Sequence, residues 1–308
     1  MLDIIGKRFR FFIISGLLML VGVIALAVFG LKSGIEFSSG SLLTLRFTEA
    51  VEIGELRQEL GQLGYPNAVV QTTGKGDFQV RVTTLTTEQK AQLEQKLEND
   101  FGPLEEVGFF SIEPTISRQT VRIAVIAVAI ATIGILLYIT WAFRRMPKPF
   151  RYGTCAIIAL LYDIFIAVGI FALLAGILGW EVNLMFITGI MAVIGYSIND
   201  KIVNFDRIRE NLLKGQNLDF EVAVNNSLVE TLTRSLNTGL CTLFTILALM
   251  LFVGSTIMNF LVVLFVGIVI GTFSSIFIAP SLLVVWEKGE WGRFIGRKPL
   301  PAGESGGR

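Results

Sequence analysis

The chain has 308 residues, of which 53% are hydrophobic and only 17% are charged. A soluble protein of this length does not need so much apolar content, so the composition favours a membrane protein. The net charge of +1 argues against nucleic acid as a partner, and the absence of histidine excludes histidine catalysis, histidine metal ligands and histidine proton relays.

Six apolar runs are each long enough to cross a bilayer, which takes about 20 residues. They cover residues 11–31, 123–143, 153–178, 184–205, 236–253 and 260–286. The first run follows basic residues as a signal sequence would, but it is too long for a signal peptide and lacks a small-residue cleavage site. We therefore expect a retained first span within residues 1–31, a five-helix remainder over residues 119–288, and a flexible cytoplasmic tail over residues 289–308.

Lysine and arginine residues gather at alternate ends of these spans. They precede the first span, lie between the second and third, and follow the fourth and the sixth. The short links 179–183 and 254–259 contain neither residue. Because cytoplasmic loops carry such an excess of positive charge, we expect a multi-pass protein of the bacterial cytoplasmic membrane with both termini in the cytoplasm.

Residues 32–118, between the first two spans, have the pattern of a small folded domain. Two stretches with helical periodicity, 51–63 and 88–101, alternate with strand-like runs at 42–47, 68–72, 78–83 and 107–112. Thr86 with Gln89 forms a capping-box signature before the second helix. The order β-α-β-β-α-β predicts an α+β ferredoxin-like domain on the extracytoplasmic side.

Residues 207–230 are helical and amphipathic in pattern, with a break at residues 215–217. We expect a second helix over residues 220–233 that lies along the inner membrane face before it turns into the fifth span. The segment is either a solvated connector or a lever coupled to Asp200.

Three ionisable residues fall within or at the edge of the predicted spans: Asp163, Asp200 and Arg234. Ionisable groups inside a membrane are costly and usually mark ion or proton pathways. Asp200 and Arg234 lie on successive spans and could neutralise each other, whereas Asp163 is a second relay acid or a residue that bonds to a neighbouring helix. Residues expected to support this site are Tyr196, Asn199, Lys201, Asn237 and Thr238.

Small polar and glycine residues in the spans have a simpler interpretation. Serine and threonine in membrane helices commonly bond to backbone carbonyls or join helices. We favour that interpretation for Ser274, Ser275 and Thr238, and we expect Gly267 and Gly271 to form a close helix contact.

The sequence contains no phosphate-binding loop and no cysteine–histidine metal cluster. It therefore predicts neither an enzyme nor a cofactor or metal site. Energy for directed work would come from an ion gradient.

Several motifs together resemble the SecF family, the smaller membrane subunits of bacterial SecD–SecF complexes, which are related to the resistance–nodulation–division transporters. The resemblance covers about residues 10–288. It rests on residues 193–200 and 205–211, on 231–235 at the entry to the fifth span, on 271–280 in the last span, and on 34–40 after the first.

This resemblance implies a function in protein export. Family members assist the passage of unfolded proteins through the SecY-E-G channel, use proton flow, and work with a SecD subunit that supplies a second six-span half. The family's intramembrane Asp and Arg correspond to Asp200 and Arg234. The sequence departs from the family pattern at Glu36, Ser39, Tyr162 and Lys201, and Lys201 could add a second positive charge near Asp200.

Two other functions remain open at this point. The chain could be half of a related small-molecule efflux permease, or a scaffold that stabilises the channel without transport. The coupling ion, proton or sodium, and the exported substrates are not determined by the sequence.

Overall fold

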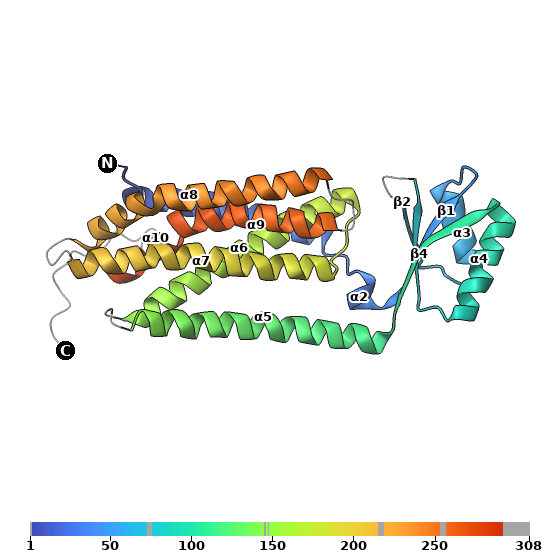
Figure 1. Ribbon diagram of the computed structural model, residues 1–308, viewed down its shortest axis with the longest axis horizontal. Helices are drawn as coiled ribbons and strands as arrows, with labels where there is room; N and C mark the ends of the chain where they lie inside the picture. Colours follow the sequence, from blue (N-terminus) through green and yellow to red (C-terminus); the bar gives the residue numbers. More distant parts are fainter. Residues whose placement is uncertain are drawn as a thin grey trace. The chain divides into compact units, whose positions relative to one another are not determined.

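A computed structural model describes residues 2–72, 76–144, 146, 148–214, 219–252 and 257–291 (Figure 1). The chain divides into two compact units, and each is described by itself. The helix unit lies within Met1–Gly30, Val128–Leu174 and Met185–Arg308, and the sheet unit is Leu31–Ala127 with Ala175–Leu184. The expected break at 215–217, and the expected tail beyond Trp291, lie outside the described residues.

Long apolar helices make up most of the helix unit, and some of them include residues of the sheet unit (Figure 1). They are α1 (Arg8–Phe29), α5 (Pro114–Ala142), α6 (Pro149–Leu178), α7 (Leu184–Lys214), α8 (Phe220–Phe252), α9 (Met258–Phe277) and α10 (Ala279–Lys288), and a short 3-10 turn, Ile5–Lys7, precedes α1. Six helical segments of the described chain are long and apolar enough to cross a membrane, with α9 and α10 counted as one. The six predicted spans and the fold class are therefore confirmed.

One predicted detail of the spans is wrong, and the last span has a break that the sequence did not indicate. The expected inner-face helix over residues 220–233 is the first part of α8, which continues without a break to Phe252. The last span is not one continuous helix, because Pro280 lies at the start of α10 and lacks the N–H that would continue the hydrogen bonding of α9. A proline at this position is tolerated only at the start of a new helix.

Helices α7 and α9 approach each other closely through small residues four positions apart. Gly267 faces Val193 so closely that a Cβ atom at Gly267 would lie 2.1 Å from a Val193 methyl carbon. One turn further on, a Cβ atom at Gly271 would lie 3.1 Å from the Cβ atom of Ser197. The predicted close contact at Gly267 and Gly271 is confirmed, and it brings Ser275, the next residue in this row, towards α7.

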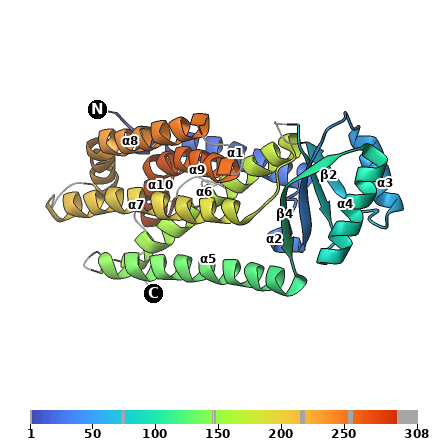
Figure 2. The ribbon, with the colours of Figure 1, turned by 45° about the vertical axis from the view of Figure 1, so that its right-hand side comes forward.

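The sheet unit has a four-stranded antiparallel sheet with two helices (Figure 2). Its elements are a short helix α2 (Ile35–Ser38), β1 (Gly40–Phe47), α3 (Ile53–Gln62), β2 (Val69–Thr72), β3 (Phe78–Val82), α4 (Thr87–Phe101) and β4 (Leu104–Ile112). The strand order β2-β3-β1-β4 and the predicted β-α-β-β-α-β sequence together define a ferredoxin-like fold. The Thr86 and Gln89 capping box begins α4 as predicted.

The core of this sheet unit lies between one face of the sheet and helices α3 and α4. Alternate residues of the central strands, Leu43 and Leu45 of β1 and Val80 of β3, are fully buried there. Leu56 and Leu60 of α3, spaced one turn apart, meet them from the helix side. The period-2 and period-3.6 patterns of the sequence thus meet in one apolar layer.

The link between α6 and α7 belongs to the sheet unit and pairs with it. Arg81 of β3 donates to Glu181 at 2.9 Å and to the Ser33 carbonyl at 2.7 Å. Val182 exchanges backbone hydrogen bonds with Lys32 and Gly34 at 2.8 and 2.7 Å. The pKa of Glu181 is raised, because the effect of burial is larger than the lowering effect of the Arg81 guanidinium.

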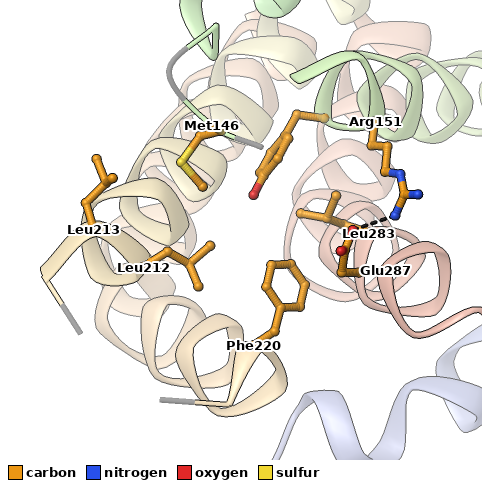
Figure 3. Close-up of a pocket in the computed structure, with 8 residues that line it drawn as sticks. Met146, Arg151, Leu212, Leu213, Phe220, Leu283 and Glu287 are labelled. Carbon is orange, nitrogen blue, oxygen red and sulfur yellow. Dashed lines mark hydrogen bonds and ion pairs between the residues drawn. The ribbon is translucent and has the colours of Figure 1, made fainter. Parts of the chain in front are cut away.

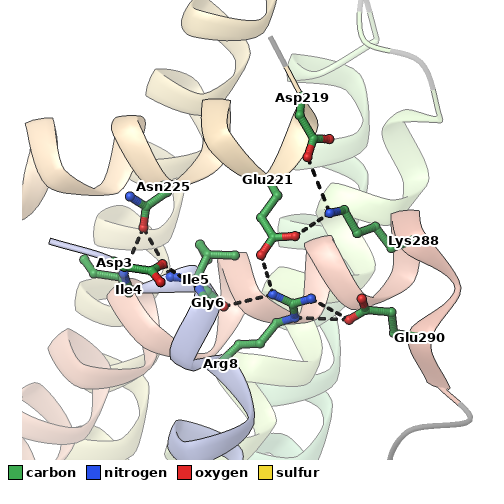
Figure 4. Close-up of polar contacts among 10 residues, drawn as sticks. All are labelled: Asp3, Ile4, Ile5, Gly6, Arg8, Asp219, Glu221, Asn225, Lys288 and Glu290. Carbon is green, nitrogen blue, oxygen red and sulfur yellow. Dashed lines mark hydrogen bonds and ion pairs between the residues drawn. The ribbon is translucent and has the colours of Figure 1, made fainter. Parts of the chain in front are cut away.

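A buried arginine at the start of α1 joins α8 to Glu290, which follows α10, in the helix unit (Figure 4). Arg8 is only 4% exposed and contacts Glu221 and Glu290, each at 2.6 Å. Asn225 accepts hydrogen bonds from the backbone N–H groups of Ile4 and Ile5. Arg8 therefore serves as a structural ion-pair centre in addition to its place in the positive charge before the first span.

The α7–α9 contact predicts the effect of one added methyl group. We expect Gly267→Ala to lower the unfolding free energy by about 1–3 kcal/mol, because the methyl overlaps Val193 in a closely packed interface. The matched control is Gly195→Ala on α7, where no atom lies within 4 Å of the added Cβ atom. Thermal unfolding in detergent should show a lower melting temperature for the first variant and an unchanged or higher one for the second.

Candidate polar site in the helix bundle

Helix α7 carries a row of buried polar residues through the apolar helix unit. Ser197, Lys201 and Asn204 are at most 1% exposed and lie at i, i+4 and i+7, so they share one face of the helix. Asn204 donates to the Ser275 carbonyl of α9 at 3.0 Å. The row therefore faces the neighbouring helices rather than the surroundings of the bundle.

Asp200 lies beside this row and is held by two hydroxyl groups from two helices. Ser235 of α8 donates to Oδ1 at 2.7 Å, and Ser275 of α9 donates to Oδ2. The Ser275 hydroxyl also lies 2.9 Å from the Thr272 carbonyl, an alternative acceptor for its single proton, so the packing role we expected for it is only part of its contacts. The carboxyl group of Asp200 thus joins α7, α8 and α9 at one point.

Lys201 does not extend towards Asp200, as we had considered, but to Asp163 on α6. Its ammonium group lies 2.5 Å from Oδ2 of Asp163, and both side chains are fully buried. Ser197 donates to the same carboxylate oxygen and also contacts the ammonium group. Consecutive residues on a helix point about 100° apart, so Asp200 contacts α8 and α9 whereas Lys201 contacts α6.

The structure does not bring Arg234 to Asp200. Arg234 is exposed on α8, and no carboxylate of the described chain forms an ion pair with it. The physical reason is again the helical rotation, because the adjacent residue Ser235 is the one that faces α7. The expectation that the two charges neutralise each other is therefore wrong for this conformation.

The residues expected to support the site are divided between the interior and the exterior. Tyr196 is partly buried against the apolar cluster of Ile246, Leu261 and Ile268. Asn199, Asn237 and Thr238 are exposed, and the Thr238 carbonyl accepts from Thr242 within α8.

Sequence reasoning missed Ser235, Ser197 and Asn204 as site residues, and it assigned Ser275 to packing only. The available signal was positional. Ser275 continues the row of Gly267 and Gly271, and Ser197 and Asn204 share a face with Lys201.

A separate cavity of about 230 Å³ lies at the ends of α6, α7, α8 and α10 (Figure 3). Apolar side chains, among them Met146, Leu212, Phe220 and Leu283, line most of it. The ion pair of Arg151 with Glu287, at 2.5 Å, lies at one side. These two charges neutralise each other, and the Tyr152 side chain also lines the cavity.

The polar site is made of side chains from α6, α7, α8 and α9. It contains two carboxyl groups, hydroxyls and one ammonium group inside an apolar bundle. Among the described residues, no group of three or more metal-ligating side chains could hold a metal ion.

Comparison with known proteins identifies the family of the chain. Residues 92–289 match the family model for the protein export membrane protein SecD/SecF, C-terminal. The protein translocase subunit SecF of Thermobaculum terrenum is 43% identical over 309 residues, which cover 96% of this chain and 98% of that protein. The chain belongs to the SecD/SecF family.

Some SecD/SecF relatives are longer chains. The protein translocase subunit SecDF of Bacillus subtilis is 35% identical to this chain, which spans 38% of its length. The crystal structure of SecDF from Thermus thermophilus, described as a translocon-associated membrane protein, has a TM-score of 0.80 at 32% identity. The match covers 93% of this SecF-family chain and 38% of that one. The chain is therefore a multi-pass membrane protein of the SecF type.

The geometry at Asp200 predicts an energetic coupling with Ser235. A double-mutant cycle of Asp200→Ala and Ser235→Ala should give a coupling free energy of about 0.5–1.5 kcal/mol, because each single change removes the same hydrogen bond. Thr238→Ala is the matched control on α8, since Thr238 is exposed and its effect should add to that of Asp200→Ala. Reversible unfolding in detergent measures all four stabilities of each cycle, and full additivity for Ser235 would contradict the hydrogen bond.

Proposed function

We propose that this SecF-family chain is an accessory subunit of the Sec protein-export machinery that uses an ion gradient to assist the translocation of unfolded proteins. The names of its relatives, protein translocase subunits SecF and SecDF, support the export role. The use of a gradient is supported by Asp200, a carboxyl group inside a membrane helix bundle. Its described hydrogen-bond partners are two neutral hydroxyls. Such a group marks ion or proton pathways in membrane proteins.

Asp200 would act as the ion carrier. Removal from water favours a neutral acid, whereas a nearby cation favours the carboxylate. Ser235 and Ser275 connect Asp200 to α8 and α9, so a change in its charge alters the contacts among three helices. A gradient can drive motion only through such a difference in free energy between two arrangements.

Arg234 would be the group that changes its relation to Asp200 during the cycle. It immediately precedes Ser235, so a rotation of α8 by about 100° would exchange the hydroxyl for the guanidinium at Asp200. In the described conformation Arg234 is exposed, which is unfavourable for a charge at membrane depth unless another chain or water accommodates it.

A SecD-like subunit would supply that other chain. This chain spans only 38% of the SecDF relative from Bacillus subtilis, and many transporters place their ion sites between two repeated halves. The SecY-E-G channel and unfolded exported proteins would be the further partners. The sheet unit would lie on the extracytoplasmic side, with both termini of the chain in the cytoplasm.

The carrier role predicts the outcome of three substitutions. Measured as export into sealed vesicles with a SecD-like subunit present, Asp200→Asn should abolish the gradient-dependent part of export. Arg234→Ala should come close to the same loss, and Asp200→Glu should retain part because the carboxyl group survives. Separate collapse of the proton and sodium gradients identifies the coupling ion.

Asp206→Asn is the matched control for this test. Asp206 lies on the same helix but is exposed and paired with Arg209 at 2.7 Å, so its neutralisation should leave gradient-dependent export unchanged. Wild-type export by Asp200→Asn, with an unchanged response to the gradient, would instead support the scaffold function.

The proposed orientation predicts opposite labelling of two exposed lysine positions. In a variant without Cys155 and Cys241, a cysteine in place of Lys96 of α4 should react with an impermeant maleimide from outside intact cells. A cysteine in place of Lys214, at the end of α7, should react only after the cells are opened, because it follows the fourth span. Labelling of both positions from one side would contradict the six-span orientation.

A further inference from the structure

We propose that Lys201 and Asp163 form a permanent buried ion pair that locks α6 to α7 and removes Asp163 from the ion pathway. This inference rests on the proposed function for its meaning in transport, but the ion pair itself is a separate claim. It assigns opposite tasks to the consecutive residues Asp200 and Lys201. Asp200 binds and releases an ion, whereas Lys201 stays paired with Asp163.

The Asp163 carboxylate already has two partners on α7. The Lys201 ammonium group lies 2.5 Å from Oδ2, and Ser197 donates to the same oxygen. All three side chains are fully buried. A positive charge tethered to the chain therefore already lies at Oδ2, and it opposes the approach of a second cation to Oδ1, which has no hydrogen-bond partner among the described residues.

Ion uptake at Asp163 would leave Lys201 without its partner. If Asp163 bound a proton or a sodium ion, Lys201 would stay buried without its counter-charge. Leaving one member of a buried ion pair unpaired is strongly unfavourable, and an ammonium group can only donate hydrogen bonds. Charge uptake at Asp163 is opposed by the residue that faces it.

Asp200 differs in both respects. Its described partners are the hydroxyls of Ser235 and Ser275, and it is partly exposed. A hydroxyl can donate to a carboxylate or accept from a protonated acid, so both partners stay satisfied in either state. Asp200 can therefore change its charge without leaving a buried neighbour unpaired.

The expected mechanical consequence is that α6 moves with α7. The contact between them, at Lys201 and Asp163, keeps its charges throughout the cycle. The contacts of α7 with α8 and α9, at Asp200, depend on the ion. The changing interface would thus be the one lined by Ser235 and Ser275.

The test compares two single variants with their combination. Lys201→Met and Asp163→Asn each leave a buried group without its partner, so each should lower the melting temperature by about 5 °C or more and reduce export. The double variant Asp163→Asn/Lys201→Met carries neither charge. Its melting temperature should exceed those of both single variants, and its gradient-dependent export should return to within about twofold of wild type.

The matched control is the pair of Glu210 and Lys214 near the surface of the same helix, joined at 2.5 Å, where Glu210 also pairs with Arg207 at 2.5 Å. Glu210→Gln/Lys214→Met should leave both the melting temperature and export unchanged, because exposed pairs contribute little.

Two results would overturn the inference. One is a double variant as stable as wild type that has lost gradient-dependent export, since Asp163 would then carry the ion. The other is a double variant less stable than both single variants, since the charges would then not be a replaceable pair. The melting temperatures test whether the ion pair exists, independently of any transport measurement. Failure of the carrier role alone would appear in Asp200→Asn while the double variant still recovers its stability.

Discussion

The close approach of α7 and α9 is the contact on which the polar site depends. Gly267 and Gly271 remove the side chains that would hold the helices apart, and Ser275 continues their row at the depth of Asp200. The interface is tight because apolar helices in a membrane gain little from burial against each other and rely on packing and polar contacts. The same closeness that stabilises the bundle delivers a hydroxyl to the carboxyl group.

The cost of a charge in an apolar environment explains how the remaining polar groups are arranged. Arg8, Asp163 and Lys201 are buried, and each has an opposite charge within about 3 Å. Asp200 is the exception among the acids of the site, because its contacts come from hydroxyls alone. This difference in pairing, rather than depth in the bundle, distinguishes the proposed carrier from the other intramembrane acid.

The sheet unit is stabilised mainly by an apolar core rather than by buried ion pairs. Its core is a conventional apolar layer between a sheet and two helices, and its hydrogen bonds extend to the α6–α7 link through Arg81 and Val182. That link is only a few residues long and contains no lysine or arginine.

The sequence by itself determined most of what lies within one segment. Six apolar runs were recognisable as spans, because length and apolar content suffice for that inference. Alternating apolar residues, helical periodicity and the Thr86 capping box specified the ferredoxin-like unit in the same way. The start of a new helix at Pro280 was equally local, but the long apolar run around it concealed the break.

Only the tertiary structure decided which side chains meet across helices. Asp200, Lys201 and Arg234 were all recognisable as candidate residues, yet their pairing was predicted wrongly. Charge alone suggested Asp200 with Arg234, whereas the rotation of α8 presents Ser235, and the rotation of α7 sends Lys201 to Asp163. Periodicity places a residue on a face of its own helix, but the partner depends on how the helices pack, and that is set by contacts distant in sequence such as Gly267 against Val193.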